Sequence, residues 1–471
     1  MLFDVRKLMT YSKPAHASAQ QNTFDFGAYL SNAESSLGVD PNLRRLTNRD
    51  DLQLLPELPM RAYFGLLHAH TFASDGLGDA RTAMITARDV ARLDFFAVTD
   101  HSEYWWRRSD ATFAEQSQIA REESRDHFVG LVGFEYSNLA QGHVVVLNST
   151  DWTNAWQKRT LEQFFDWLAE PQQSDAIAIF AHPGFHKYRD WFDLAHFQMD
   201  GRLQKQFVGV EFIHRNVWRR AMRGYSGHRS FLDEALDQGW HVGPVASQDN
   251  HTAFWGVSDG NRLALLLKGL SRADVLEALK ARRFYSTQSP QLQMSVGLYS
   301  GNSLLATLGD RINASSIKLS ESTLRVRFLE PNSNSVPYRL EVLLNGEPVR
   351  SLAFLDSSSG RDFSELGDLK SELHTQGRGA VTRDPWWTSL LNNGLVTGKP
   401  LSWLFEKQSH VEPEIFDVSV PISWSGCAEV TNAKQKNWTI GVRYFQGAEG
   451  DKLTVTSPII VQCSASPALP K

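Results

Sequence analysis

Six histidines and three acidic residues between positions 68 and 251 are of the types that bind metal ions. In two pairs, His68 with His70 and Asp249 with His251, the residues are two apart, so in an extended chain both side chains point to the same side. Burying so many imidazoles and carboxylates together is costly without compensation, and bound metal ions supply that compensation. The set therefore predicts a metal centre, and its members are His68, His70, Asp75, His101, Glu135, His143, His182, Asp249 and His251.

Each short motif in this set also has a purely structural explanation. A lone HxH is common on a half-buried strand, and Pro183-Gly184 explains AHPG as a turn. The prediction of a metal centre depends on the combination. Hard carboxylates and imidazoles suit Zn, Mn or Fe, and the absence of cysteine ligands argues against a structural zinc site.

The ligand-type residues lie at or beside the ends of predicted strands. Strands alternate with helices between residues 61 and 290, which is typical of a parallel α/β sheet or barrel. In parallel α/β barrels the active site lies at the C-terminal ends of the strands. The predicted strands are 61–70, 94–101, 127–137, 142–148, 176–184, 207–216 and 241–251, and the predicted helices are 79–93, 156–170, 230–240 and 271–284.

The pattern changes after about residue 290 to short alternating segments that resemble strands. The pair Asn345-Gly346 between two apolar segments is a strong signal for a β-hairpin. We therefore predict three parts, with an insertion near 356–410 in the last one. They are a lead-in over 1–60, an α/β barrel domain with the predicted metal centre over 61–290 and a C-terminal β-sandwich over 291–471.

The motifs HAHTFASDG, VTDH, AHPG and DNH, together with Glu135 and His143, resemble those of the polymerase and histidinol phosphatase (PHP) family. The resemblance covers roughly half of the chain, and it matches all nine residues of the set above to ligands of the family. It implies a distorted seven-stranded (β/α)7 TIM-like barrel that holds two to three divalent transition-metal ions. The tail LEALKARRFYSTQSP is similar to that of larger members with an appended β-domain, some of which belong to a carbamate-hydrolase branch.

The resemblance also implies a chemistry. A metal ion lowers the pKa of its bound water from about 16 to about 7, which gives a hydroxide nucleophile at neutral pH. By analogy with related barrels, Asp249 is also a candidate catalytic proton shuttle. The family implies phosphoester hydrolysis most often.

Several residues beyond the ligand set are candidates for supporting roles. Arg215 and His186 are candidate substrate-binding residues, Arg215 because its guanidinium can bind a phosphate or carboxylate with two hydrogen bonds. Glu211 is a candidate hydrogen-bond partner for a ligand. Asp100 either orients a ligand or caps a turn. For each of them, a structural ion pair or hydrogen bond is the plainer alternative.

Two other functions fit the same residues. One is hydrolysis of a carboxylester, carbamate or amide, and the other is a binding module built on an inactive barrel. The expected partner is a small-molecule substrate. A net charge of −5 gives no reason to expect nucleic acid. No apolar run approaches the roughly 18 residues of a membrane span, and no signal peptide is expected. The sequence leaves open the metal, the oligomeric state, the compartment and whether Cys427 and Cys463 pair.

Overall fold

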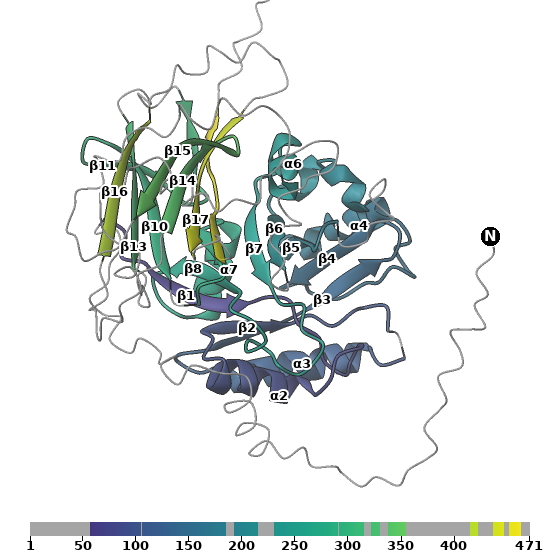
Figure 1. The fold of residues 1–471 in the computed structure, drawn as a ribbon. Helices are drawn as coiled ribbons and strands as arrows, with labels where there is room; N and C mark the ends of the chain where they lie inside the picture. The colour runs from purple at the N-terminus through teal and green to yellow at the C-terminus, as the bar shows by residue number, and fades with distance from the viewer. Residues whose placement is uncertain are drawn as a thin grey trace, which may run out of the picture. The chain divides into compact units, whose positions relative to one another are not determined.

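The fold of the α/β part is built from nine strands, shown in Figure 1. The computed structural model describes residues 57–104, 106–184, 193–214, 230–290, 292–314, 322–329, 338–354, 415–422, 437–446 and 452–462. The nine strands are β1 (Arg61–Leu66), β2 (Phe95–Val98), β3 (Val129–Asn138), β4 (Gly142–Leu147), β5 (Ile177–Ala181), β6 (Phe207–His214), β7 (Gly243–Ser247), β8 (Arg262–Leu267) and β9 (Phe284–Thr287).

The helices of this part lie between the strands, and a polar side chain caps the N-terminus of each α-helix. The caps are Asp79, Ser109, Thr160, Ser230 and Ser271, each of which accepts a hydrogen bond from a backbone N–H of the first turn. The helices are α2 (Ala80–Ile85), the π-helical turn η3 (Thr86–Val90), α3 (Asp110–Glu123), α4 (Leu161–Leu168), α6 (Phe231–Asp237) and α7 (Arg272–Lys280), with short 3-10 turns η4 (Pro171–Gln173), η5 (Asp193–Phe197) and η6 (Gly201–Leu203).

The strands form one mixed sheet in the order β9-β8-β1-β2-β3-β4-β5-β6-β7. The pairs β1–β2, β2–β3, β5–β6 and β6–β7 are parallel, whereas β4 is antiparallel to both of its neighbours. The strand–helix alternation had predicted a parallel sheet. The difference arises at two places. The short turn that joins β3 to β4 permits only an antiparallel pair, and β8 is antiparallel to both β1 and β9.

The C-terminal ends of β1 and β7 meet, although these strands are far apart in the sheet order. The amide of His70 donates to the carbonyl of Asn250 over 3.0 Å, and Ala69 and Asn250 form a parallel bridge. The sheet therefore curls until the residues that follow β1 and β7 contact each other, at the end where the ligand-type residues lie.

Apolar side chains fill both faces of the curled sheet. All ten residues of β3 are buried, so one face of this strand lines the interior and the other lies under helices. Inside, Val145, Ile179 and Val245 belong to one apolar cluster. Outside, Phe164 of α4 stacks on Tyr136 with ring centroids 4.1 Å apart. Full burial of such side chains contributes about 1.5–3 kcal/mol each.

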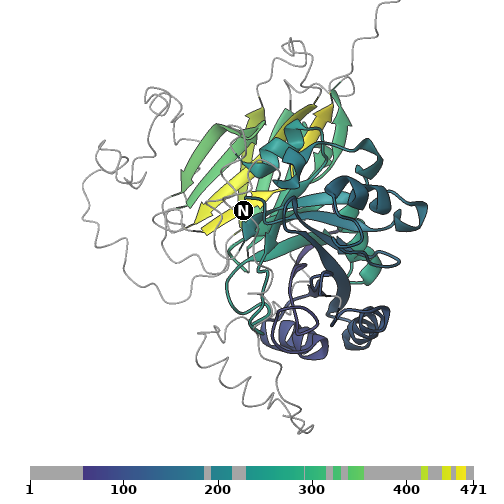
Figure 2. The ribbon, with the colours of Figure 1, turned by 90° about the vertical axis from the view of Figure 1, so that its right-hand side faces the viewer.

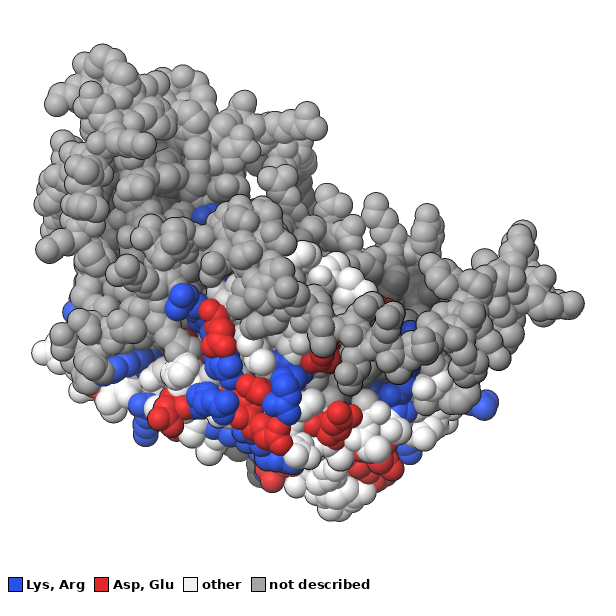
Figure 3. Space-filling view, turned by 90° about the horizontal axis from the view of Figure 1, so that it is seen from below, with Lys and Arg blue, Asp and Glu red and all other residues white. Residues whose placement is uncertain are grey.

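Helices α2 and α3 pack against each other and against β2 and β3, and they are seen end-on in Figure 2. A Cβ atom at Gly130 would lie 2.6 Å from the carbonyl oxygen of Ala120, so glycine is required for α3 to approach β3 this closely. The outer surface of the helix pair is charged. Arg81 bonds to Glu122 and Glu123, and Figure 3 shows basic and acidic atoms interleaved on this side of the molecule.

The chain after residue 290 continues as strands. A second sheet has the order β11-β10-β13-β16, and the remaining strands extend the first sheet through pairing of β18 with β9. Side chains from both sheets, among them Val326 and Val442, share one apolar cluster. The strands are β10 (Gln293–Ser300), β11 (Ser303–Thr307), β12 (Arg311–Asn313), β13 (Ser322–Leu329), β14 (Tyr338–Leu344), β15 (Glu347–Phe354), β16 (Ile415–Ile422), β17 (Asn437–Gln446), β18 (Lys452–Thr456) and β19 (Ile459–Gln462).

The predicted hairpin joins β14 to β15. Asn345 and Gly346 form its turn with φ angles of 50° and 72°, the left-handed values that a tight two-residue turn requires. The division near residue 290 stays a prediction, and hydrogen bonds of the first sheet cross it. The insertion near 356–410, both cysteines and residues 1–56 of the lead-in lie outside the described residues. No helix among the described residues is long and apolar enough to cross a membrane.

Candidate metal centre

The nine ligand-type residues converge at one end of the curled sheet. Most of them lie at the C-terminal ends of strands or in the turns that follow. His143 is at the start of β4, but β4 is antiparallel to its neighbours, so its start lies at the same end, where His143 pairs with Ser137 of β3 and Ala181 of β5. The sheet topology therefore brings side chains from six strands to one place.

The carboxylate of Glu135 lies at the middle of this cluster and is completely buried. Its Oε1 atom is 2.9 Å from Nδ1 of His143 and 2.9 Å from Nε2 of His182. Its Oε2 atom is 2.8 Å from Nδ1 of His101, 3.3 Å from Nε2 of His68 and 3.4 Å from Nε2 of His70. One carboxylate thus faces five imidazole nitrogens.

A hydrogen bond from outside the cluster fixes the orientation of His68. Nδ1 of His68 lies 2.7 Å from Oε1 of Glu211, and an ionised carboxylate only accepts hydrogen bonds, so Nδ1 carries a proton. Oε2 of Glu211 accepts a hydrogen bond from the backbone amide of His182 over 2.8 Å. Nε2 of His68 is therefore the atom turned toward Glu135, and Glu211 holds two ligand-type residues from different strands. The role expected for Glu211 agrees with this geometry.

His70 is oriented by a relay through Ser74. The Ser74 hydroxyl donates its single proton to Oδ1 of Asp100 over 2.7 Å, so its oxygen accepts from Nδ1–H of His70 at 3.3 Å. Asp100 is itself fixed by the amide and hydroxyl of Thr71 and by the side-chain amide of Gln116. The relay leaves Nε2 as the atom that His70 presents to the cluster.

The surroundings of His70 test whether a cation fits here. Burial and the nearby charge of His101 lower the pKa of His70 to about 4, so its ring is neutral at pH 7. Its Nε2 then has a lone pair that lies 2.9 Å from Oδ1 of Asp249, which is also an acceptor. Two acceptors at this distance repel each other unless a cation lies between or beside them. The donor set therefore fits a metal ion.

Other pKa shifts show the same preference for positive charge. Burial lowers the pKa of His68, but the carboxylates of Glu211, Glu135 and Asp249 outweigh this effect and hold it well above the usual value. Burial likewise opposes the charged form of His101, yet Glu135 raises the pKa of that ring to about 9. Without metal, protons occupy the places that metal ions would take, so metal binding releases protons.

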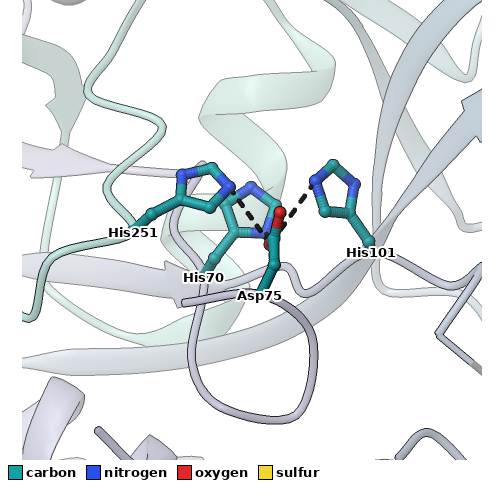
Figure 4. A group of neighbouring side chains, drawn as sticks. All are labelled: His70, Asp75, His101 and His251. Atoms are coloured by element: carbon teal, nitrogen blue, oxygen red, sulfur yellow. Dashed lines mark ion pairs between the residues drawn. The ribbon is translucent and has the colours of Figure 1, made fainter. Parts of the chain in front are cut away.

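Asp75 forms a second part of the cluster, shown in Figure 4. Its Oδ1 atom lies 3.2 Å from Nε2 of His251, 3.7 Å from Nε2 of His101 and 4.0 Å from Nδ1 of His70. Burial alone would raise the pKa of Asp75, but the hydrogen bond from His251 and the charge of His101 hold it well below its usual value. The carboxylate is therefore ionised and faces three rings.

Three groups of side chains have ligand atoms within 4.8 Å of one another, close enough to share an ion. The groups overlap, because His70, His101 and Glu135 each belong to two of them, and overlapping ligand sets are what a multinuclear centre needs. His182 belongs to none of them but contacts Glu135. The groups are His70, Asp75, His101 and His251; His68, His70, Glu135 and Asp249; and His101, Glu135 and His143.

Backbone strain coincides with two of these positions. His182 and Asp249 have φ angles of 26° and 46°, in a region that residues other than glycine rarely adopt. Such conformations cost about 1–3 kcal/mol each and collect at functional sites. The strain is consistent with selection for ligand geometry at the ends of β5 and β7.

Two predicted substrate-binding residues lie outside the described residues, and two serine contacts in the cluster were not predicted. Arg215 and His186, the candidate substrate-binding residues, lie outside the described ranges, so their roles stay predictions. The sequence analysis did not identify Ser74 or Ser137, whose hydroxyl lies 2.6 Å from Nδ1 of His101. Ser137 is two residues after Glu135 on the same strand, and that spacing is the signal that could have revealed it.

Comparisons with known proteins do not assign the chain to a family. No family model matches the sequence, and no curated protein matches it. Solved structures give only distant similarities. A two-domain protein from Bacteroides vulgatus ATCC 8482, which contains a predicted PHP-like metal-dependent phosphoesterase, is 14% identical, with a TM-score of 0.38 over 63% of this chain and 84% of that one.

Two further structures match more weakly by TM-score. PsfC from Pseudomonas syringae PB-5123 is 17% identical, with a TM-score of 0.33 over 46% of this chain and 88% of that one. Endonuclease Q, in complex with a 27-mer duplex that has an abasic lesion, is 10% identical, with a TM-score of 0.27 over 46% of this chain and 56% of that one. At these scores the similarities carry no functional assignment, which has to come from the geometry of the site.

Proposed function

We propose that this protein is a metal-dependent hydrolase of the PHP type that cleaves a phosphoester. The observation that carries the proposal is the setting of Glu135, whose buried carboxylate has five imidazole nitrogens within 3.4 Å. Bound divalent ions such as Zn, Mn or Fe would activate water and stabilise charge on a substrate oxygen. The motif resemblance and the overlapping ligand groups support two to three such ions.

The residues of the chain have distinct parts in this proposal. His68, His70, Glu135 and Asp249 would hold one ion, and Asp75, His101 and His251 would contribute to a second. Glu135 would be shared between ions because both of its oxygens face ring nitrogens. Asp249 would also accept the proton of the attacking water, and its ionised form suits this task, since nearby positive rings outweigh burial and hold its pKa well below the usual value.

We also propose an architecture for this function. Strands β1–β7 would form a distorted seven-stranded barrel, supported by the bridge between Ala69 and Asn250. The sheets after residue 290 would form an accessory β-sandwich, supported by their shared apolar cluster. Arg215 and His186 are proposed to bind the substrate.

A substrate panel tests the proposed reaction. The full chain, reconstituted separately with zinc and with manganese, should hydrolyse nitrophenyl phosphate monoesters or diesters faster than nitrophenyl acetate. The variant Glu135→Gln should lose this activity. A matched control is Glu234→Gln, because Glu234 is also buried and lies 3.5 Å from a histidine, His196, but belongs to α6.

The possible outcomes separate the alternatives. Turnover of the carboxylester alone would replace the phosphoesterase by an ester, carbamate or amide hydrolase on the same residues. Metal uptake without turnover of either class would favour a binding module. Equal activity in the Glu135→Gln variant and the wild type would contradict a role for this cluster.

A further inference from the structure

We infer that the substrate carries an apolar group of the size of an aromatic ring beside the bond that is cleaved. This group would lie on an apolar rim, which we define as the side chains of Phe72, Trp106 and Trp156. The inference rests on the proposed function, since it assumes that the reaction takes place at the cluster around Glu135.

The rim is unusual in its exposure to solvent. Phe72 is 56% exposed, Trp106 60% and Trp156 64%, although large aromatic side chains bury most of their surface in typical proteins. Single exposed apolar residues need no explanation, but neighbouring ones mark binding surfaces. Phe72, Trp106 and Trp156 therefore mark a binding surface if the segments that carry them lie side by side.

Hydrogen bonds join the three segments that carry the rim. The guanidinium of Arg107, the residue after Trp106, donates to the carbonyl oxygens of Phe72 over 3.2 Å and Ser74 over 2.6 Å. The indole N–H of Trp156 donates to the carbonyl oxygen of Glu103 over 3.1 Å. The backbone of Phe72 and the indole of Trp156 are thus held beside Arg107 and Glu103, which follow β2 at the end of the sheet where the cluster lies.

A contact through Tyr104 connects the rim to the cluster. The ring of Tyr104 stacks on His101 with centroids 5.9 Å apart and an interplanar angle of 18°. The ring of Tyr104 also contacts the ring of Trp106, with centroids 5.0 Å apart and an interplanar angle of 49°. Two ring contacts therefore lead from ligand-type residues to the exposed Trp106.

The chemistry of the rim selects the kind of group that it binds. The only hydrogen-bond donor of the Trp156 side chain is used by Glu103, so Trp156 offers its ring faces rather than a polar contact. Phe72 offers a ring face alone. Such faces favour planar apolar groups, which stack on them in offset or edge-to-face arrangements. A substrate whose reactive group reaches the cluster would place an adjoining aryl group on the rim.

Binding of two pairs of uncleavable acids tests this inference. Titration calorimetry with the metal-loaded full chain would compare naphthylmethylphosphonate with methylphosphonate, and naphthylacetate with acetate. The aryl member of a pair should bind about tenfold more tightly, in line with a stacking contribution of about 1.4 kcal/mol. The variant Trp106→Ala should reduce this preference about three- to tenfold, and Trp106→Phe should restore most of it.

A control variant and the unfavourable outcomes complete the test. Met199→Ala removes another exposed apolar side chain, 36% exposed, from the segment that precedes β6 at the opposite end of that strand, and it should keep the full preference. Equal affinities within each pair, or a preference that Trp106→Ala does not change, would overturn the inference and leave the proposed function intact. A chain that takes up no metal and binds none of the four acids would overturn both.

Discussion

Nδ1 of His68 and Oε1 of Glu211 lie 2.7 Å apart in a fully buried contact between β6 and the end of β1. The same carboxylate holds the backbone amide of His182. Glu211 therefore sets the positions of two ligand-type residues without facing the centre of the cluster itself. The contribution of Glu211 to metal binding can therefore be tested separately from that of the ligand-type residues.

Replacing Glu211 by Gln should weaken metal binding about 10- to 100-fold, the usual effect of removing a hydrogen-bond partner of a metal ligand. The amide of Gln can still accept one hydrogen bond, so the fold should persist. Competition with a chromophoric chelator measures the affinity, and Glu234→Gln is the control. Unchanged metal affinity in Glu211→Gln would show that this contact is structural only.

Replacing His70 by Ala should reduce kcat/KM more than about a hundredfold, since a ligand contributes more than the outer partner of a ligand. The fold should survive, because the interior of the sheet is apolar and does not depend on the cluster. Steady-state kinetics and the thermal midpoint, measured on the same sample, check both statements. Full activity, or loss of the folded state, would contradict this separation of site and core.

The partly buried His241 makes stability depend on pH at a place remote from the cluster. Burial and the charges of Arg282 and Arg311 lower the pKa of His241 to about 3, and its Nε2–H donates to the carbonyl of Gly309 over 2.8 Å. Above pH 6.5 the ring is neutral in both the folded and the unfolded chain and has no effect. As the pH falls from 6.5 toward 3, the unfolded chain gains a proton that the folded chain does not, so stability is lost.

The expected loss is up to about 1.4 kcal/mol per pH unit over that range. Urea unfolding of the chelator-treated protein at several pH values would measure it. The variant His241→Gln should show a shallower decrease than the wild type, because the acidic groups common to both proteins cancel in the comparison. Parallel pH profiles would show that His241 titrates normally.

The nucleophile can be identified with labelled water. A single turnover in ¹⁸O-water should place the heavy oxygen in the product phosphate, since the proposed attack comes from water and not from a side chain. Mass spectrometry of the product reads this directly. Isolation of a phosphorylated or acylated protein in the same experiment would indicate a covalent nucleophile instead.

Much of the fold could be predicted where a local pattern decides the structure. The left-handed turn at Asn345-Gly346 follows from the two residues alone, and the alternating segments around it became β14 and β15. Helix α3 was not predicted. Of its three fully buried residues two are polar, Gln116 and Glu123, which bond to Asp100 and Arg88, so the apolar period of this helix is weak. Such a helix is defined by partners that are distant in sequence.

In the candidate site, too, the sequence predicts some features, and others depend on contacts between residues that are distant in sequence. That the nine residues would meet could be predicted, because strand ends of an α/β sheet share one edge. Which nitrogen of each ring faces the cluster could not, since that depends on contacts such as those of His68 with Glu211 and His70 with Ser74. The direction of β4 depends on the short turn after β3, because no helix separates these two strands.

The most direct measurement of the central claim is the metal content of the full-length protein. Elemental analysis after reconstitution and removal of free metal should find roughly two to three transition-metal ions per chain, as the three overlapping ligand groups require. Glu135→Gln should lose at least one of them, because both carboxylate oxygens of Glu135 face the cluster. A content below about half an ion per chain in the reconstituted wild type would contradict the account.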